Sequence, residues 1–255
     1  PGIEIKSAKI DGKIAKFKII PTGVVVMIKD KWKFDEKHSI DFEYVATPKK
    51  GLYFIGWNQP KVEDPSVWHT RQQIWTQGQG IDNRHWIPMY DDMGDKFYTE
   101  TIITFDEDYQ VLSNGDLLSK KKEKDGKIKW HYKLNNPHAG YLLMVAIGKY
   151  AVKSTKTKRG TPVNFWYYPE FEERAKWTSM HTSKMIEFLE DETGVAYPWG
   201  AYSQVMVQDF LYGAMENTSA TIFGDFFFVD ERAFLDRNYI GVNCHELTHQ
   251  WIRDL

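Results

Sequence analysis

Short apolar runs separated by turn residues dominate the chain up to about residue 166. The turn signals recur at intervals of about ten residues, which is the spacing of an antiparallel sandwich or open sheet. Asp11-Gly12 and Asp125-Gly126 each stand between two strand-like runs, and this dipeptide suits the positive backbone angles of a tight hairpin turn. Lys120–Lys124 is interpreted as an exposed strand protected by its charges. Residues 1–166 are therefore predicted to form an N-terminal antiparallel β domain.

The period of the sequence changes at Pro169. Beyond it, side chains recur at spacings that fit one helical face, and Gly194 is placed to end the helix. The recurring positions are Phe171, Ala175, Thr178, Met185, Ile186 and Leu189. Strand-like runs follow at Val205–Val207 and Phe226–Val229. The chain is therefore predicted to be α+β, with a second, mixed α/β region over residues 167–255.

The strongest chemical signal is His245-Glu246-Leu247-Thr248-His249, which matches the zinc-binding pattern HExxH. Residues four apart lie on the same face of an α-helix, so both imidazoles can reach one metal ion at about 2 Å. A helix counted from Ile240 gathers five apolar side chains in a stripe less than about 100° wide and turns both histidines away from it. The stripe consists of Ile240, Cys244, Leu247, Trp251 and Leu255.

Two histidines do not complete a catalytic zinc site, which usually has three protein ligands and one position open to water. Nothing in the spacing of His131, His138 or His181 marks any of them as the third ligand. They are interpreted as surface histidines or as histidines with ordinary hydrogen-bond partners.

Composition narrows the class of protein. The 255 residues are 42% hydrophobic and 27% charged, which is typical of a folded globular chain. Lys and Arg total 33 against 35 Asp and Glu, and the formal charge of -2 argues against nucleic acid or an anionic membrane surface as a partner. No apolar run approaches the roughly 20 residues of a membrane span. The single Cys244 cannot form an internal disulfide, and no leader is visible, so the compartment, cytoplasmic or exported, stays open.

A second motif, Gly213-Ala214-Met215-Glu216-Asn217, precedes the HExxH segment. Together the two motifs resemble the M1 family of zinc aminopeptidases, whose signatures are GAMEN and HExxH in this order. The resemblance extends over further segments from about residue 70 onward. These are residues 76–79, 83–88, 91–92 and 113–115, Lys96, and Tyr197-Pro198-Trp199.

The resemblance implies a saddle-like β domain followed by the start of a thermolysin-like catalytic domain, and it implies removal of single residues from peptides with a free N-terminus. His245 and His249 match the zinc ligands, and Glu246 matches the general base that activates water. Glu216 matches the carboxylate that holds the substrate amine, and Gln79 matches a second amine-binding position. The remaining predicted substrate contacts are Gly213, Ala214 and Met215, with Tyr212 lining the pocket for the first side chain.

Three features of the family pattern are not found in these residues. The third zinc ligand of the family is a glutamate roughly 18 residues after the second histidine, which falls beyond Leu255. The tyrosine that stabilises the oxyanion in the family also falls beyond that residue, and Met93-Gly94 replaces a common proline in a β-domain loop. We therefore expect a fragment of a longer enzyme, inactive by itself, whose missing part would be its own C-terminal portion.

Three functions from different classes stay open at this point. The first is a zinc aminopeptidase. The second is a related metallohydrolase of the same family, either an endopeptidase or a bifunctional epoxide hydrolase. The third is a β-rich binding fragment without catalysis.

Overall fold

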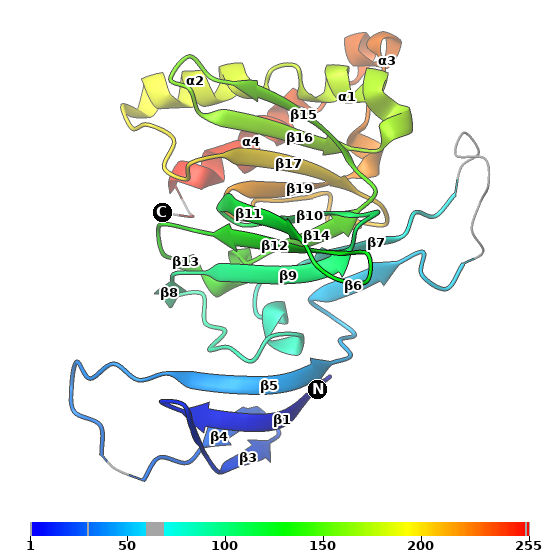
Figure 1. Cartoon of the computed structure of the whole chain (residues 1–255). Coiled ribbons are helices and arrows are strands. Elements are labelled where there is room, and N and C mark those ends of the chain that lie inside the picture. Colours follow the sequence, from blue (N-terminus) through cyan, green and yellow to red (C-terminus); the bar gives the residue numbers. More distant parts are fainter. Residues whose placement is uncertain (1, 30, 60–68, 253, 255) are drawn as a thin grey trace.

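The computed structural model describes residues 2–29, 31–59, 69–252 and 254. An N-terminal β-rich part is followed by a mixed sheet with helices, which confirms the predicted α+β class (Figure 1). Among the described residues, no helix is long and apolar enough to cross a membrane.

A small β unit lies at the N-terminal end of the molecule (Figure 1). Strands β1 (Ile3–Ile10), β2 (Lys13–Ile14) and β5 (Ile40–Ala46) form an antiparallel sheet, and β3 (Phe17–Ile20) pairs with β4 (Gly23–Val26). Asp11 and Gly12 have φ angles of 51° and 75°, and Ile10 pairs with Lys13 across them. These positive angles confirm the predicted two-residue turn.

Two larger antiparallel sheets follow this unit. The first has the order β10-β14-β7-β6 and consists of β6 (Leu52–Ile55), β7 (Gln73–Thr76), β10 (Gln110–Ser113) and β14 (Val145–Gly148). The second has the order β11-β12-β9 and consists of β9 (Glu100–Asp106), β11 (Asp116–Lys122) and β12 (Lys127–Lys133). The short strands β8 (Lys96–Phe97) and β13 (His138–Ala139) pair with each other. The lysine-rich β11 is largely exposed, as predicted, and it lies at a sheet edge.

The mixed sheet has the order β15-β16-β17-β19-β18. Its strands are β15 (Ala151–Lys156), β16 (Pro162–Tyr167), β17 (Tyr202–Val207), β18 (Ala214–Met215) and β19 (Ala220–Gly224). The three central strands run parallel, whereas β15 and β18 join them antiparallel at the two edges. The predicted boundary near residue 166 falls inside β16, and this division of the chain stays a prediction.

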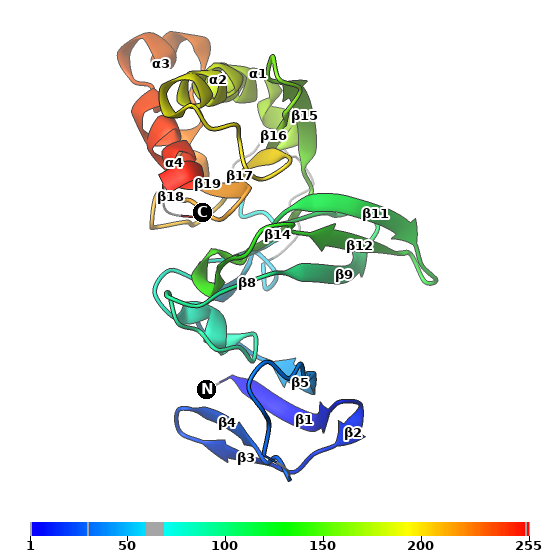
Figure 2. The same cartoon turned by 90° about the vertical axis from the view of Figure 1, so that its left-hand side faces the viewer.

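Within the described part of the chain, four α-helices accompany the mixed sheet (Figure 2). They are α1 (Glu172–Ser179), α2 (Thr182–Thr193), α3 (Glu231–Asp236) and α4 (Ile240–Ile252). Gly194 has a φ angle of 70° and its N–H donates to the carbonyl of Glu190, so it ends α2 as predicted. The predicted helix over this region is interrupted at Met180 and His181, between α1 and α2.

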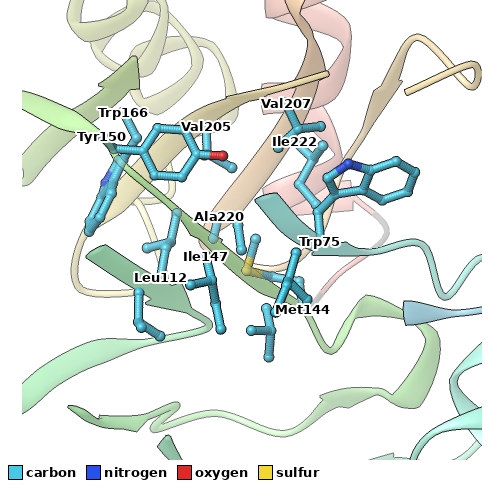
Figure 3. Close-up of a cluster of buried hydrophobic side chains, with 14 of the residues drawn as sticks. Trp75, Leu112, Met144, Ile147, Tyr150, Trp166, Val205, Val207, Ala220 and Ile222 are labelled. Atoms are coloured by element: carbon cyan, nitrogen blue, oxygen red, sulfur yellow. The ribbon is translucent and has the colours of Figure 1, made fainter. Parts of the chain in front are cut away.

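Strands β17 and β19 of the mixed sheet are buried on both faces. Val205 and Val207 of β17 and Ile222 of β19 pack into a core shared with Trp75, Leu112 and Ile147 of the β10-β14-β7-β6 sheet (Figure 3). The alternate residues of β17 point to the opposite face of the sheet, which the helices cover. There Tyr202 packs with α2 and α4, and Met206 packs with α1. Because the two parts share one apolar core, they hold each other in a fixed relation.

The predicted strand at Phe226–Val229 is wrong. Residues Asp225–Phe227 form a 3-10 turn, and the strand of this region is β19, which ends at Gly224, directly before that turn. Every residue of β19 is buried, and its sequence, Ala-Thr-Ile-Phe-Gly, is neither alternating nor strongly apolar. Phe227 is buried in an aromatic cluster from the turn itself, so the apolar run reflects core packing rather than strand pairing.

Candidate active site

Helix α4 carries the HExxH segment and packs by one face. Leu247 and Trp251 are buried and Cys244 packs against the same cluster, as the predicted stripe requires. Ile240 is the first residue of α4, lies outside that cluster and is 36% exposed. The prediction that Ile240 belongs to the buried stripe is therefore wrong. Leu255 lies outside the described residues. His245 is exposed, and both histidines point away from the apolar face as predicted.

The two histidines of α4 are arranged as a pair. Their Nε2 atoms lie 3.3 Å apart, and their rings are nearly perpendicular at 89° with centroids 4.8 Å apart. Two nitrogen ligands at about 2.1 Å from a tetrahedral zinc ion are separated by about 3.4 Å. The imidazole pair therefore fits a zinc ion in both donor type and spacing.

The GAMEN segment reaches this pair from the edge of the mixed sheet. Gly213 turns the chain with a φ angle of 87°, and Ala214 and Met215 pair with β19 as strand β18. Glu216 follows at the point where this pairing ends. Ligand atoms of Glu216, Glu246 and His249 all lie within 4.8 Å of one another, and His245 adjoins this group through His249.

This group concentrates negative charge in a buried place. Glu216 is 5% exposed and Glu246 is 8% exposed. Burial, and secondly the nearby Glu216 carboxylate, raise the pKa of Glu246 to about 7. Two buried carboxylates are costly unless cations or protons compensate them. The arrangement therefore suits a site that receives positive charge, from a metal ion at the imidazoles and from a ligand at the carboxylates.

The loop 216–219 is held between the two parts of the molecule. Gln250 of α4 donates from Nε2 to the Glu216 carbonyl at 2.9 Å and accepts from the Ser219 N–H at 2.7 Å. On the other side, Asn114 donates to the Thr218 carbonyl at 2.7 Å, and His138 Nδ1 lies 3.1 Å from Thr218 Oγ1. Sequence reasoning missed Gln250. The one feature of the sequence that could have indicated Gln250 is its position as a polar residue beside the apolar stripe of α4.

The other predicted substrate-binding residues lie in the loop after β7, in the segment before β18 and in β18 itself. Gln79 is exposed, and Tyr212, which is 55% exposed, contacts Phe210 and forms a hydrogen bond with Tyr53. Ala214 is half-buried on the edge strand β18. The side chain of Met215 is instead buried in the shared core, which leaves only its main chain for substrate.

The three remaining histidines that sequence reasoning considered have other partners. His131 pairs with Glu100 at 2.5 Å, and the ring of His181 lies against Phe234 at a tilt of 39°, with ring centroids 6.1 Å apart. His138 is buried between the hydroxyls of Thr99 and Thr218. Each of the three therefore has the ordinary role that sequence analysis predicted.

Comparison with known proteins places these features in a family. The model described as the Peptidase M1 N-terminal domain matches residues 3–142, and the model described as the Peptidase family M1 domain matches residues 177–255. A "Probable aminopeptidase 2" of Sulfurisphaera tokodaii is 28% identical, with 100% of this chain and 31% of the relative covered.

Other relatives show the same relation. A "Leucyl aminopeptidase" of Saccharolobus solfataricus is 25% identical over 100% of this chain and 31% of the relative. The "Glutamyl aminopeptidase" of Bos taurus is 24% identical over 92% of this chain and 27% of the relative. The chain thus spans about a third of the length of the curated relatives it matches. Both family models match in the expected order, and the chain belongs to peptidase family M1.

Proposed function

We propose that this chain is part of a zinc-dependent aminopeptidase that removes residues from the free N-terminus of peptides. One observation carries the proposal: the buried carboxylates of Glu216 and Glu246 converge with the His249 imidazole within 4.8 Å. Two acids from two different elements meet beside a pair of imidazoles. Hydrolysis of a substrate that bears its own positive charge explains this arrangement.

In this proposal His245 and His249 hold the zinc ion, which fits the 3.3 Å separation of their nitrogens. When bound, zinc polarises the scissile carbonyl and acidifies water. We propose that the third ligand is a glutamate beyond residue 255, as in the family pattern.

Glu246 is proposed as the general base. Its carboxylate accepts a proton from the water that attacks the first peptide carbonyl, and it then returns that proton to the leaving amine as the C–N bond breaks. The same carboxylate therefore serves first as a base and then as an acid. The carboxylate starts and finishes the reaction in the same protonation state.

Glu216 is proposed to select the chain end. Its carboxylate would pair with the substrate ammonium, at a distance from the histidine pair that places the first peptide bond for attack. An N-acetylated peptide offers no ammonium to this carboxylate. Gln79 would give a second contact to the amine, the main chain of Gly213, Ala214 and Met215 would line the substrate backbone, and Tyr212 would flank the first side chain.

The test uses the full-length protein with two substrates that differ only in the N-terminus, an amino-acid anilide and its N-acetyl analogue. We expect hydrolysis of the free-amine anilide alone, its loss with a chelator and its return with added zinc. Equal cleavage of both anilides would contradict the aminopeptidase proposal. Activity that survives complete removal of metal would contradict the zinc proposal.

A further inference from the structure

We propose that Gln250 is a positioning residue that fixes the distance between the amine-binding carboxylate and the histidine pair. It acts through the backbone of the loop 216–219 and does not itself touch substrate. The inference rests on the proposed aminopeptidase function and assigns the residue that sets its selectivity for α-amino groups.

The side chain of Gln250 connects two segments that carry different parts of the site. It follows His249 directly on α4, and its Nε2 donates to the carbonyl of Glu216 at 2.9 Å. Its Oε1 accepts from the N–H of Ser219 at 2.7 Å, so the amide holds both ends of the loop. A third bond, from Nε2 to Asp254 Oδ2 at 2.9 Å, orients the same amide from its own helix end.

Pairing with the sheet does not extend to Glu216. Strand β18 pairs with β19 through Ala214 and Met215 only, at the sheet edge, and the register ends one residue before Glu216. Ser219 then adopts a φ angle of 64° before the chain enters β19. The loop between these points depends on side chains for its position relative to α4.

Further restraints on the loop come from β17, where the Ser203 N–H donates to the Ser219 carbonyl at 2.8 Å, and from the β-rich part. Asn114 binds the Thr218 carbonyl, the Gly115 N–H donates to Ser219 Oγ at 2.7 Å, and His138 binds the Thr218 hydroxyl. These contacts fix the loop relative to the β domain, whereas Gln250 fixes it relative to the metal-binding helix. Gln250 is 0% exposed, so water cannot replace its bonds without a rearrangement.

A fixed offset between an anion and the reacting centre discriminates between amines at different distances from the scissile carbonyl. An α-amino substrate has one carbon between the amine and that carbonyl, and a β-amino substrate has two. If Gln250 sets the offset, its loss should harm the α-amino substrate more than the β-amino substrate. A general loss of stability or zinc would lower the activity toward both substrates in the same proportion.

The test measures kcat/KM of the full-length enzyme for alanyl and β-alanyl anilides in the wild type, Q250M and Y197F. Methionine has a similar volume and lacks both hydrogen-bonding groups. Y197F is the matched control, since it removes a buried hydroxyl that donates to Gln250 Oε1 at 3.3 Å and leaves the bonds to the loop intact. Zinc content and the unfolding midpoint are recorded for each protein.

We expect the ratio of alanyl to β-alanyl activity to fall at least about tenfold in Q250M and to stay near the wild-type value in Y197F. An unchanged ratio in zinc-loaded Q250M, or an equal fall in Y197F, would overturn the inference while the proposed function stands. A wild type that cleaves neither anilide would overturn both. If Q250M does not fold, a crystal structure of the wild type with a bound amino acid tests the proposal. A Gln250 side-chain amide that does not contact the Glu216 carbonyl in that structure would contradict it.

Discussion

Protonation of His138 should loosen the junction that holds the Glu216 loop. The ring is 0% exposed and lies between the hydroxyls of Thr99 and Thr218, 3.1 Å from each. Burial, and secondly the positive charge of Lys96, lower the pKa of His138 to about 4. The folded chain therefore keeps a neutral imidazole under conditions in which the unfolded chain carries an imidazolium.

The magnitude follows from the difference between the two pKa values. The ordinary histidine pKa is 6.5 and the folded value is about 4. A difference of about 2.5 units corresponds to about 3 kcal/mol at 1.36 kcal/mol per unit. Because the unfolded chain binds the proton more tightly, the free energy of unfolding is highest above pH 6.5 and falls as the pH drops toward 4.

The assay is urea denaturation at several pH values between 8 and 4 for the wild type and H138Q. Other acid-sensitive groups affect both proteins, so the difference between their unfolding free energies isolates His138. We expect H138Q to be the less stable protein at pH 8 and to regain about 2 to 3 kcal/mol relative to the wild type by pH 4.5. H131Q, which removes a histidine at the surface of β12, serves as the control substitution. Parallel curves for the wild type and H138Q would refute the reasoning.

Three further outcomes are expected. E246Q in the full-length enzyme should keep zinc and lose kcat by orders of magnitude, because an amide accepts no proton from water. Near-normal turnover of E246Q with a full zinc content would contradict this prediction. In a metal titration, a polypeptide of residues 1–255 should bind zinc much more weakly than the full-length enzyme, because two imidazoles are an incomplete set of zinc ligands. The H245A variant of this polypeptide should bind zinc more weakly still. Hydrogen bonding to Asp11, and secondly to Glu36, raises the pKa of His38. The protonated His38 should therefore stabilise the N-terminal β unit fully below pH 6.5, and this stabilisation should be lost as the pH rises through the raised pKa. In thermal unfolding, the Tm of the wild type should fall over this pH range, and the Tm of H38Q should not show that fall.

Features that depend on neighbouring residues were predictable from the sequence. The turns at Asp11-Gly12 and Asp125-Gly126 need positive φ angles, which these residues adopt at little cost, and both form. Gly194 ends α2 for the same reason. The separation of His245 and His249 by four residues is enough to bring their rings together on any α-helix.

Features that depend on packing between distant segments were not predictable. Strand β19 is covered on both faces, which removes the alternation that identifies a strand, and the aromatic run after it fills the core from a 3-10 turn. Gln250 and His138 have defined roles only because the loop 216–219 folds against them. Their identity as polar residues gives no indication of which segment they hold.

The amine-binding role of Glu216 is the central claim, and the paired-substrate measurement on E216A tests it most directly. The full-length wild type and E216A are compared on an amino-acid anilide and its N-acetyl analogue, with zinc content measured in both. We predict unchanged zinc and a fall in kcat/KM of about a hundredfold for the free-amine anilide, equal to about 2.7 kcal/mol, with no comparable fall for the acetylated one. Equal losses on both substrates, or no loss on either, would contradict the assignment of Glu216 as the residue that selects the free N-terminus.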